Sequence, residues 1–172
     1  KDKRGQVKHL WAPWRSEYVK SGASGECVFC VSRAKSPEEG LVLFSGALST
    51  VMLNKFPYNS AHLLIAPVRH VASVEELTPE EALDSFRLLR HSVTVLKKEY
   101  NPNGFNIGMN IGAAAGAGIE AHLHTHIVPR WSGDMNFMPV LSDTKVIPEH
   151  IQSTLKRLLP YFHSIDNEAS NG

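Results

Sequence analysis

The chain has 172 residues, of which 42% are hydrophobic and 20% charged, and its formal net charge is +1. This length and composition predict one globular domain with arms, and the small net charge gives no reason to expect stable binding to nucleic acid or to an anionic membrane. No apolar run approaches the roughly 20 residues of a membrane helix, and the basic first residues lack the hydrophobic stretch of a signal peptide. We therefore expect a cytoplasmic protein without a membrane partner.

The N-terminal segment predicts an arm that packs onto its own domain, because Trp11, Pro13 and Trp14 precede a stretch rich in Gly and Ser. The only two cysteines, Cys27 and Cys30, follow it with the spacing C-x-x-C. In a reducing compartment such a pair is more often a metal or redox site than a structural disulfide.

Residues 41–68 predict a β-rich region. Residues 41–53 contain two short apolar runs separated by Ser45 and Gly46, which is typical of a hairpin. Residues 54–60 then form a turn, and residues 61–68 read as a strand that ends at Pro67.

A long helix begins after Thr78, where the sequence TPEE supplies an N-cap Thr, a Pro at the first helical position and Glu81 for a capping box. Apolar residues at three- and four-residue steps predict one buried stripe. They are Leu83, Phe86, Leu89, Val93, Leu96 and Tyr100. The sequence NPNG at 101–104 ends the helix.

The remaining elements are a strand over 104–112, an Ala/Gly loop over 113–118, a strand carrying three histidines, a short helix over 148–162 with Pro148 early in it, and a frayed tail. Strands with hairpin-like spacing on either side of one central helix predict an antiparallel sheet with helices on a face, which is the α+β class.

The three histidines, His122, His124 and His126, occupy alternate positions. On a strand, alternate residues share one face, and Pro129 is expected to end this strand. One metal ion cannot hold all three, because the outer two side chains start roughly 13 Å apart on a strand. An HExxH zinc-protease helix is excluded by Leu123. We expect some of these histidines to bind or orient, and one to react.

A second cluster is predicted around the cysteines. Tetrahedral zinc needs four ligands, and Cys27 and Cys30 could obtain the other two from His70 and His122. A thioredoxin-type redox pair is the alternative, because residues 31–34 could begin a short helix.

These motifs together resemble the histidine-triad (HIT) family. The resemblance rests on HLHTHIV, on LNKFPYNSAHLLIAPVRH upstream and on the CVFC knuckle, and it covers most of residues 26–130. LWAPWR, GFNIGMN and TKVIPE are most similar to the bacterial branch of diadenosine tetraphosphate phosphorylases and related hydrolases. The resemblance implies a five-stranded antiparallel sheet with one long helix and a short C-terminal helix. It also divides the chain into an N-terminal arm (1–25), a HIT domain (26–140) and a C-terminal extension (141–172).

The resemblance also implies roles for single residues. His124 attacks the phosphorus next to the nucleoside, His126 contacts phosphate oxygens and His62 supports the cluster. Asn54 binds the ribose and Asn110 the phosphates, while Cys27, Cys30, His70 and His122 bind a structural zinc. The family's polar pair before the triad is absent, so the backbone amides of Gly116 and Gly118 would have to contact phosphate. Trp131, which directly follows the histidine strand, is expected to stack on the base.

The chemistry of the residues agrees with this reading. Neutral imidazole is a nucleophile near pH 7, and glycines allow backbone N–H groups to approach an anion. The sequence has no P-loop and no carboxylate cluster for magnesium, and it implies no organic cofactor. The resemblance implies a homodimer, and we expect an enzyme that cleaves dinucleoside polyphosphates by phosphorolysis or hydrolysis. The alternatives are a nucleoside phosphoramidate hydrolase and a nucleotide-binding regulatory protein with little turnover. The residues directly after His126 include no carboxylate, which argues against a cupin-like metal barrel.

Overall fold

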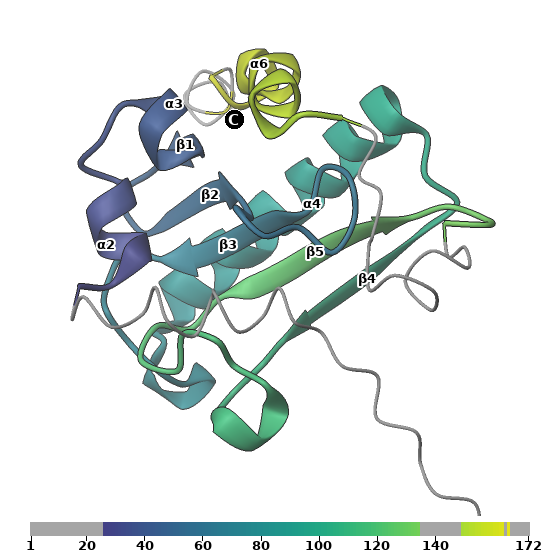
Figure 1. The fold of residues 1–172 in the computed structure, drawn as a ribbon. Coiled ribbons are helices and arrows are strands. Elements are labelled where there is room, and N and C mark those ends of the chain that lie inside the picture. The colour runs from purple at the N-terminus through teal and green to yellow at the C-terminus, as the bar shows by residue number, and fades with distance from the viewer. Residues whose placement is uncertain (1–25, 135–148, 164, 166–172) are drawn as a thin grey trace, which may run out of the picture.

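A five-stranded antiparallel sheet forms the centre of the structure, a computed structural model that describes residues 26–134, 149–163 and 165. The strands are β1 (Val42–Ser45), β2 (Ser49–Leu53), β3 (Leu63–Pro67), β4 (Gly104–Met109) and β5 (Thr125–Arg130). They lie in the order β1-β2-β3-β5-β4, with every neighbouring pair antiparallel (Figure 1). The predicted α+β class and the hairpin within 41–53 are confirmed. The predicted N-terminal arm, with Trp11 and Trp14, lies outside the described residues.

The long helix, α4 (Pro79–Tyr100), covers one face of this sheet. The Thr78 side chain accepts a hydrogen bond from the Glu81 backbone N–H, and the Glu81 carboxylate accepts one from the Thr78 N–H. The predicted capping box is therefore present. Asn101 adopts the left-handed conformation at φ 44° and ends the helix, as NPNG predicts.

The buried stripe of α4 differs from the predicted one in the first half of the helix. Leu83 and Phe86 are 73% and 70% exposed. The side chains that face the sheet there belong to Glu81 and Leu88. The ion pair between Glu81 and Arg69 brings this side of the helix inward, so Leu83 and Phe86 face away from the sheet. From the middle of the helix onward the prediction is correct for Leu96, which is fully buried.

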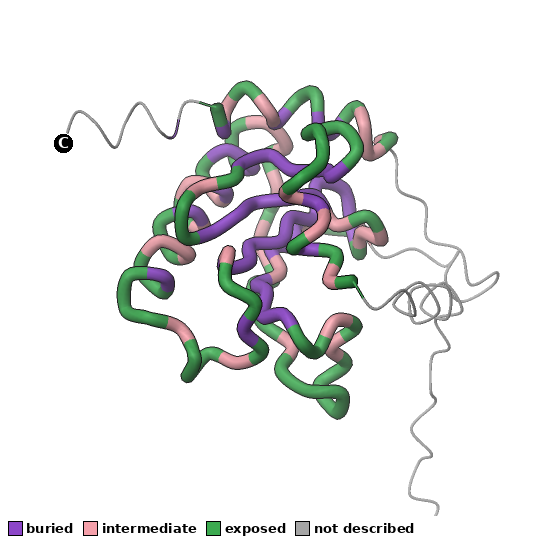
Figure 2. Tube along the Cα trace, turned by 90° about the vertical axis from the view of Figure 1, so that its left-hand side faces the viewer, coloured by how far each residue is buried: buried purple, intermediate pink, exposed green. Residues whose placement is uncertain are grey.

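A second helix, α6 (Ile151–Phe162), packs on the same face beside α4 and over β1. It begins at Ile151 after the N-cap His150, later than predicted, and Pro148 lies outside the described residues. Its buried residues Leu155, Leu158 and Phe162 join the main core. Figure 2 shows this buried layer running through the middle of the molecule.

The opposite face of the sheet carries a smaller apolar cluster beneath the cysteine segment. Helix α2 (Val28–Ser32) buries Phe29 against Met52 and Leu64, and α3 (Pro37–Gly40) follows it. Short 3-10 turns at Val74–Glu76 and Ala113–Ala115 complete the described elements. Among the helices that the structure describes, none has the length and apolarity needed to span a membrane.

The predicted histidine strand needs two corrections. β5 begins only at Thr125, so His126 lies in the strand while His122 and His124 precede it. Pro129 does not end the strand, which continues to Arg130. The Pro129 carbonyl accepts a hydrogen bond from the Asn59 side chain rather than from a strand, since pairing with β3 stops at Ile127. The N–H that proline lacks would lie on this same unpaired side, so proline is tolerated there.

Candidate functional site

His126 and His62 form a directional hydrogen-bond chain on the face of the sheet opposite α4. His62 Nε2 lies 2.9 Å from His126 Nδ1. His62 Nδ1 must be an acceptor, because the Tyr58 backbone N–H donates to it at 3.0 Å. His62 Nε2 therefore carries the proton and donates to His126 Nδ1, which leaves the single ring proton of neutral His126 on Nε2.

His124 has the opposite tautomer. Its Nδ1 lies 2.8 Å from the backbone oxygen of His122. A carbonyl only accepts, so Nδ1 carries the proton and Nε2 carries the lone pair. Burial lowers the pKa of His124, and the hydrogen bond to His122 opposes this shift. The geometry thus favours a neutral imidazole with a nucleophilic Nε2.

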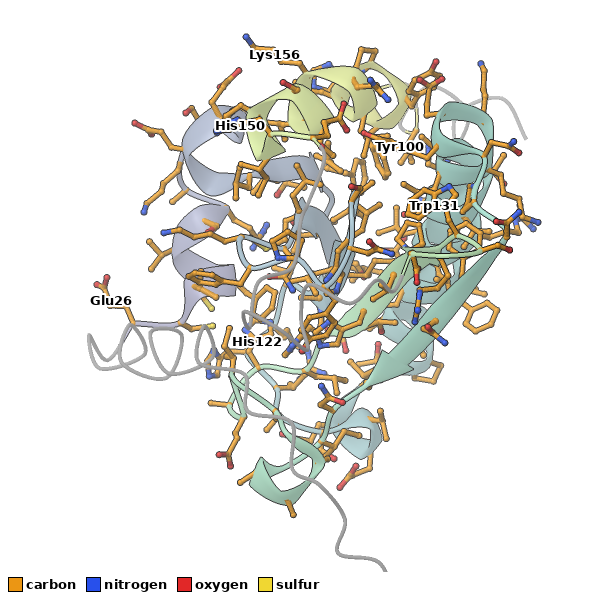
Figure 3. The ribbon with its side chains drawn as sticks, turned by 45° about the vertical axis from the view of Figure 1, so that its right-hand side comes forward. Glu26, Tyr100, His122, Trp131, His150 and Lys156 are labelled. Carbon is orange, nitrogen blue, oxygen red and sulfur yellow. The ribbon has the colours of Figure 1, made fainter. Side chains whose placement is uncertain are left out.

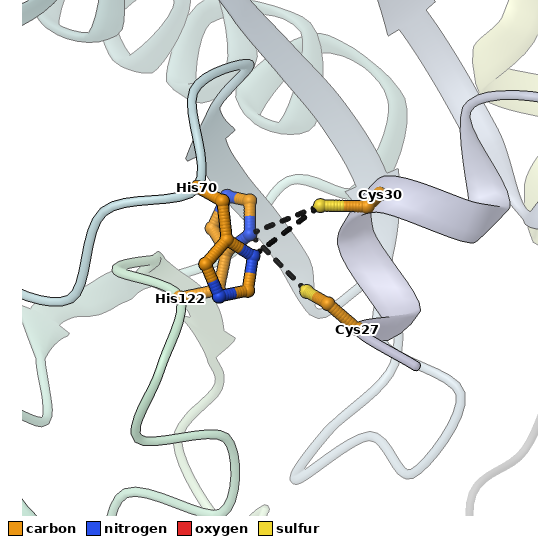
Figure 4. Close-up of side chains that lie close together, drawn as sticks. All are labelled: Cys27, Cys30, His70 and His122. Carbon is orange, nitrogen blue, oxygen red and sulfur yellow. Dashed lines mark hydrogen bonds between the residues drawn. The ribbon is translucent and has the colours of Figure 1, made fainter. Parts of the chain in front are cut away.

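His122 belongs to the second cluster, which the structure assembles from three distant segments (Figure 4). His122 Nδ1 lies 3.2 Å from Cys27 Sγ and 3.7 Å from Cys30 Sγ. His70 Nδ1 lies 3.4 Å from Cys30 Sγ. All four ligand atoms lie within 4.8 Å of one another, so these residues could hold a metal ion.

The cluster fits a tetrahedral ion. Sulfur at about 2.3 Å and nitrogen at about 2.0 Å from a zinc ion place bound S and N atoms about 3.5 Å apart, close to the separations in the structure. His122 Nε2 lies 2.9 Å from the Pro67 carbonyl oxygen and so carries the proton. That hydrogen bond leaves the lone pair on Nδ1, which faces the sulfurs, as a metal ligand requires. Burial lowers the pKa of His122 and favours the same neutral form.

Two of the predicted nucleotide-binding residues, Asn54 and Asn110, lie near the histidines. Asn54 Nδ2 lies 3.3 Å from His62 Nδ1, and Asn54 Oδ1 accepts the Phe56 N–H at 2.9 Å. Its side chain thus supports the turn, and its ribose role stays a prediction. Asn110 directly follows Met109, which pairs with Thr125, and so lies level with His124.

The glycines of this region leave the site open. Gly108 pairs with His126 across the β4–β5 ladder, and a side chain there would meet nothing within 4 Å. Gly116 has φ 81°, a conformation that glycine adopts readily, and Gly118 is exposed in the same loop. Their contact with phosphate stays a prediction.

Trp131 is not brought beside the histidines (Figure 3). It follows the last residue of β5 and lies five positions after His126, which corresponds to roughly 17 Å along a strand. Its indole N–H donates to the Tyr100 carbonyl at the end of α4 at 3.1 Å. The structure therefore gives Trp131 an anchoring contact, while its predicted stacking on a base stays a prediction.

Two aromatic residues of the site were missed by the sequence analysis. Phe29 packs on both His122 and His124, with ring centroids 5.0 and 4.9 Å apart. Tyr58 stacks on His126 with an interplanar angle of 17°. The position of Phe29 between the two cysteines was an available signal. Tyr58 lies in an irregular turn, where periodicity gives no information.

Comparison with known proteins places this site in a family. A model of the HIT domain matches residues 36–133. The AP-4-A phosphorylase of Mycobacterium tuberculosis is 39% identical over 165 residues, which cover 91% of this chain and 84% of that protein. The asymmetrical bis(5'-nucleosyl)-tetraphosphatase of Schizosaccharomyces pombe is 33% identical over 103 residues, covering 60% of this chain and 56% of that protein.

Solved structures agree on the fold. A zinc-bound histidine triad family protein from Mycobacterium smegmatis superposes with a TM-score of 0.64 at 21% identity, covering 84% of this chain and 99% of that one. A histidine triad nucleotide-binding protein from Sulfolobus tokodaii gives a TM-score of 0.64 at 21% identity, covering 83% of this chain and 95% of the other. The predicted sheet with one long helix and a C-terminal helix is confirmed.

Proposed function

The chain belongs to the HIT family, and from this premise we propose that it is an enzyme that cleaves dinucleoside polyphosphates through a nucleotidyl group carried on His124. Diadenosine tetraphosphate is the substrate that we infer, because the relative with 39% identity over most of both chains is an AP-4-A phosphorylase. The tetraphosphatase relative supports the same substrate class.

The observation that carries the proposal is the pair of complementary tautomers at His124 and His126. His124 presents a lone pair at Nε2, because its Nδ1 proton is held by the His122 carbonyl. His126 presents a proton at Nε2, because its Nδ1 accepts from His62. The two rings are in contact at 4.9 Å between centroids. A nucleophile therefore lies beside a donor for phosphate oxygens.

The reaction follows in two displacements. His124 Nε2 attacks the phosphorus next to one adenosine, an N–P bond forms, and the bond from this phosphorus to the bridging oxygen breaks to release ATP. Inorganic phosphate or water then attacks the same phosphorus, and the N–P bond breaks. Phosphate gives ADP and water gives AMP, and His124 is regenerated in either case.

Phosphate binding is proposed for the open surface beside the triad. His126 donates to a phosphate oxygen, Asn110 lies level with the nucleophile, and Gly108 leaves room for the polyphosphate. The backbone amides at Gly116 and Gly118 supply further donors, which this chain needs because the family's polar pair is absent.

We also propose that Cys27, Cys30, His70 and His122 bind one zinc ion. Their donor set and separations fit tetrahedral zinc with four protein ligands, which is the pattern of a structural site. When bound, the ion would join the cysteine segment to the sheet, without taking part in the displacements. We propose a cytoplasmic location, where reducing conditions would keep both thiols available to the metal.

A homodimer is proposed from the edge of the sheet. β4 lies at this edge, and its Ile107 and Met109 are 46% and 41% exposed. Ile107 pairs with the buried Ile127 and so projects on the α4 side, where Leu83 and Phe86 are also exposed. Edge strands with exposed apolar side chains are typical of interfaces.

The dimer is tested by light scattering. The wild type should give twice the chain mass, and a variant with both Phe86→Lys and Met109→Lys should give the mass of a monomer.

The function is tested by incubating the protein with diadenosine tetraphosphate, with and without phosphate, and separating the products. We expect ATP with ADP when phosphate is the acceptor, and ATP with AMP when water is. Rapid denaturation during turnover should trap adenylate on wild-type protein but not on His124→Ala. Cleavage by His124→Ala within about tenfold of wild type would contradict the covalent mechanism, since loss of a nucleophile costs far more.

A further inference from the structure

Phe29 lies where the cysteine segment meets the reactive histidine. It occupies the middle of the C-x-x-C sequence, on the five-residue helix α2, and is 1% exposed. Its ring contacts His122 at 5.0 Å and His124 at 4.9 Å between centroids, with tilts of 44° and 37°. One side chain thus contacts a residue of the metal-binding cluster and the proposed nucleophile at once.

The orientation of the His124 ring depends on few contacts. Its Nδ1 proton is held by the His122 carbonyl, and its ring contacts His126 on one side and Phe29 on another. The hydrogen bond restrains Nδ1, and the flanking groups further limit rotation about the Cβ–Cγ bond of His124. Of the rings around His124, Phe29 is the apolar one. His122 and His126 are held by hydrogen bonds of their own, whereas Phe29 acts on His124 through packing alone.

The position of Phe29 is in turn set by the cysteines. A helix of five residues has little stability of its own. Cys27 and Cys30 attach it to the sheet through His122 and His70. The smaller apolar cluster of Val42, Met52, Leu64 and Ala66 supports the Phe29 ring from below.

We infer that Phe29 is a positioning residue, through which the Cys27–Cys30 segment holds the His124 imidazole with Nε2 aimed at the substrate. This inference rests on the proposed role of His124 as nucleophile. It assigns to the cysteine segment an effect on the chemical step, in addition to its effect on stability. The contact with Phe29 should be needed for turnover and not for binding of the nucleotide.

The test compares Phe29→Leu with Phe162→Leu as a matched control. Phe162 is equally buried, at 0% exposed, but lies in the main core and contacts His91 instead of the triad. Both variants lose a buried ring, so both should melt at lower temperature. We expect kcat to fall roughly ten- to a hundredfold in Phe29→Leu, because small misplacements of a reacting group are costly. The Michaelis constant should stay within about twofold, and Phe162→Leu should keep the kcat of wild type.

A spectroscopic measurement tests the same inference without substrate. Nitrogen NMR on protein with 15N-labelled histidine reports which ring nitrogen of His124 carries the proton. Wild type and Phe162→Leu should show the Nδ1–H form alone, and Phe29→Leu a mixture of tautomers or a broadened signal. Phe29→Met, which keeps much of the volume without the flat ring, is measured if Phe29→Leu binds less metal than wild type.

The outcomes separate the two proposals. An altered His124 signal in a protein that cleaves no dinucleotide would support the role of Phe29 and contradict the proposed function. An unchanged signal with wild-type kcat would overturn the role of Phe29. A raised Michaelis constant with unchanged kcat would also overturn it, because the ring would then serve nucleotide binding.

Discussion

The tautomers of three histidines in this site are set by hydrogen bonds to backbone groups. The Pro67 carbonyl fixes His122, the His122 carbonyl fixes His124, and the Tyr58 N–H fixes His62. Each of these contacts joins an imidazole to a backbone group, so it depends on the path of the chain rather than on another side chain. Three identical side chains at alternate positions can therefore have three different roles.

His62 is expected to act through His126. In His62→Ala, His126 Nδ1 would lose its donor and the orientation of the ring would no longer be fixed, so kcat should fall roughly ten- to a hundredfold, as is typical for partners that orient an imidazole. His62→Gln keeps an amide donor and should recover part of the loss. His91→Ala is the control, since this half-buried histidine bonds to the Tyr161 carbonyl on the opposite side of the sheet. Steady-state kinetics on the three variants measure these changes in kcat. A His62→Ala enzyme with wild-type kcat would show that the hydrogen bond from His62 to His126 is not needed for turnover.

At the scale of elements, the start of α4 depends on a buried carboxylate. Glu81 completes the capping box, and Arg69 contacts both of its carboxylate oxygens at 2.7 Å. The Glu81 side chain is 3% exposed, whereas Arg69 is 50% exposed. The hydrogen bond from Arg69 is the main reason why the pKa of Glu81 falls to about 2.

This shift makes stability dependent on pH. Because the folded pKa lies below the usual value for Glu, the contribution is complete above about pH 5 and is lost as the pH falls toward 2. Glu81→Gln should be less stable than wild type by about 1–3 kcal/mol at pH 7, since it leaves buried groups poorly paired. The difference should shrink steadily between pH 5 and pH 3 in urea denaturation. Glu120→Gln, at an exposed loop position, should show no such convergence, and a gap that is constant with pH would contradict the assignment.

The turn that carries His62 meets helix α6 around a small cavity. Its volume is about 20 Å³, and its lining includes Ser60 and His62 from the turn with Glu149 and Thr154 from the start of α6. Among the described residues, the buried Ser60 Oγ has no hydrogen-bond partner. A cavity of this size with polar groups in its lining has room for one water molecule.

We predict an ordered water bonded to Ser60 Oγ in a high-resolution crystal structure. If it bridges the turn and α6, Ser60→Ala should lower the free energy of unfolding by about 1 kcal/mol. Thr94→Ala, at an exposed position of α4, is the control. A more stable Ser60→Ala protein would mean that the hydroxyl is buried without a partner and that no water joins the two elements.

For the whole molecule, local patterns predicted the elements better than their contacts. The capping box of α4, the hairpin and the strand ending at Pro67 follow from signals within a few residues, and all are present. The side of α4 that carries Leu83 and Phe86 was predicted wrongly, because periodicity gives the spacing of a stripe and not the surface that covers it. Strand bounds at Thr125 and Arg130 depend on pairing with β3 and β4, which a single segment does not contain.

The candidate site shows the same division. The residue types Cys, Cys, His and His at 27, 30, 70 and 122 were sufficient to predict a cluster, and the structure brings their ligand atoms together. The contacts of Phe29 and Tyr58 with the histidines could not be predicted, because they depend on how α2 and the turn at 54–62 pack on the sheet. Family resemblance supplied the roles proposed for His124 and His126, and their hydrogen bonds with the His122 carbonyl and the His62 side chain give tautomers that suit those roles.

Metal binding should affect the whole molecule, because the four cluster residues come from segments up to 95 positions apart. Purified protein should contain about one zinc per chain, and a chelator should lower its melting temperature, since an ion that binds only the folded state stabilises it. Cys27→Ser should reduce zinc content and melting temperature together, while His163→Ala, an exposed histidine after α6, should change neither. Atomic absorption measures the zinc content, and calorimetry the melting temperature, of the wild type and the two variants. Metal-free wild-type protein with a reversible Cys27–Cys30 disulfide would instead establish the redox alternative. In that case α2 would be held to the sheet by Phe29 and its apolar neighbours without help from His70 and His122, and melting would be insensitive to the chelator.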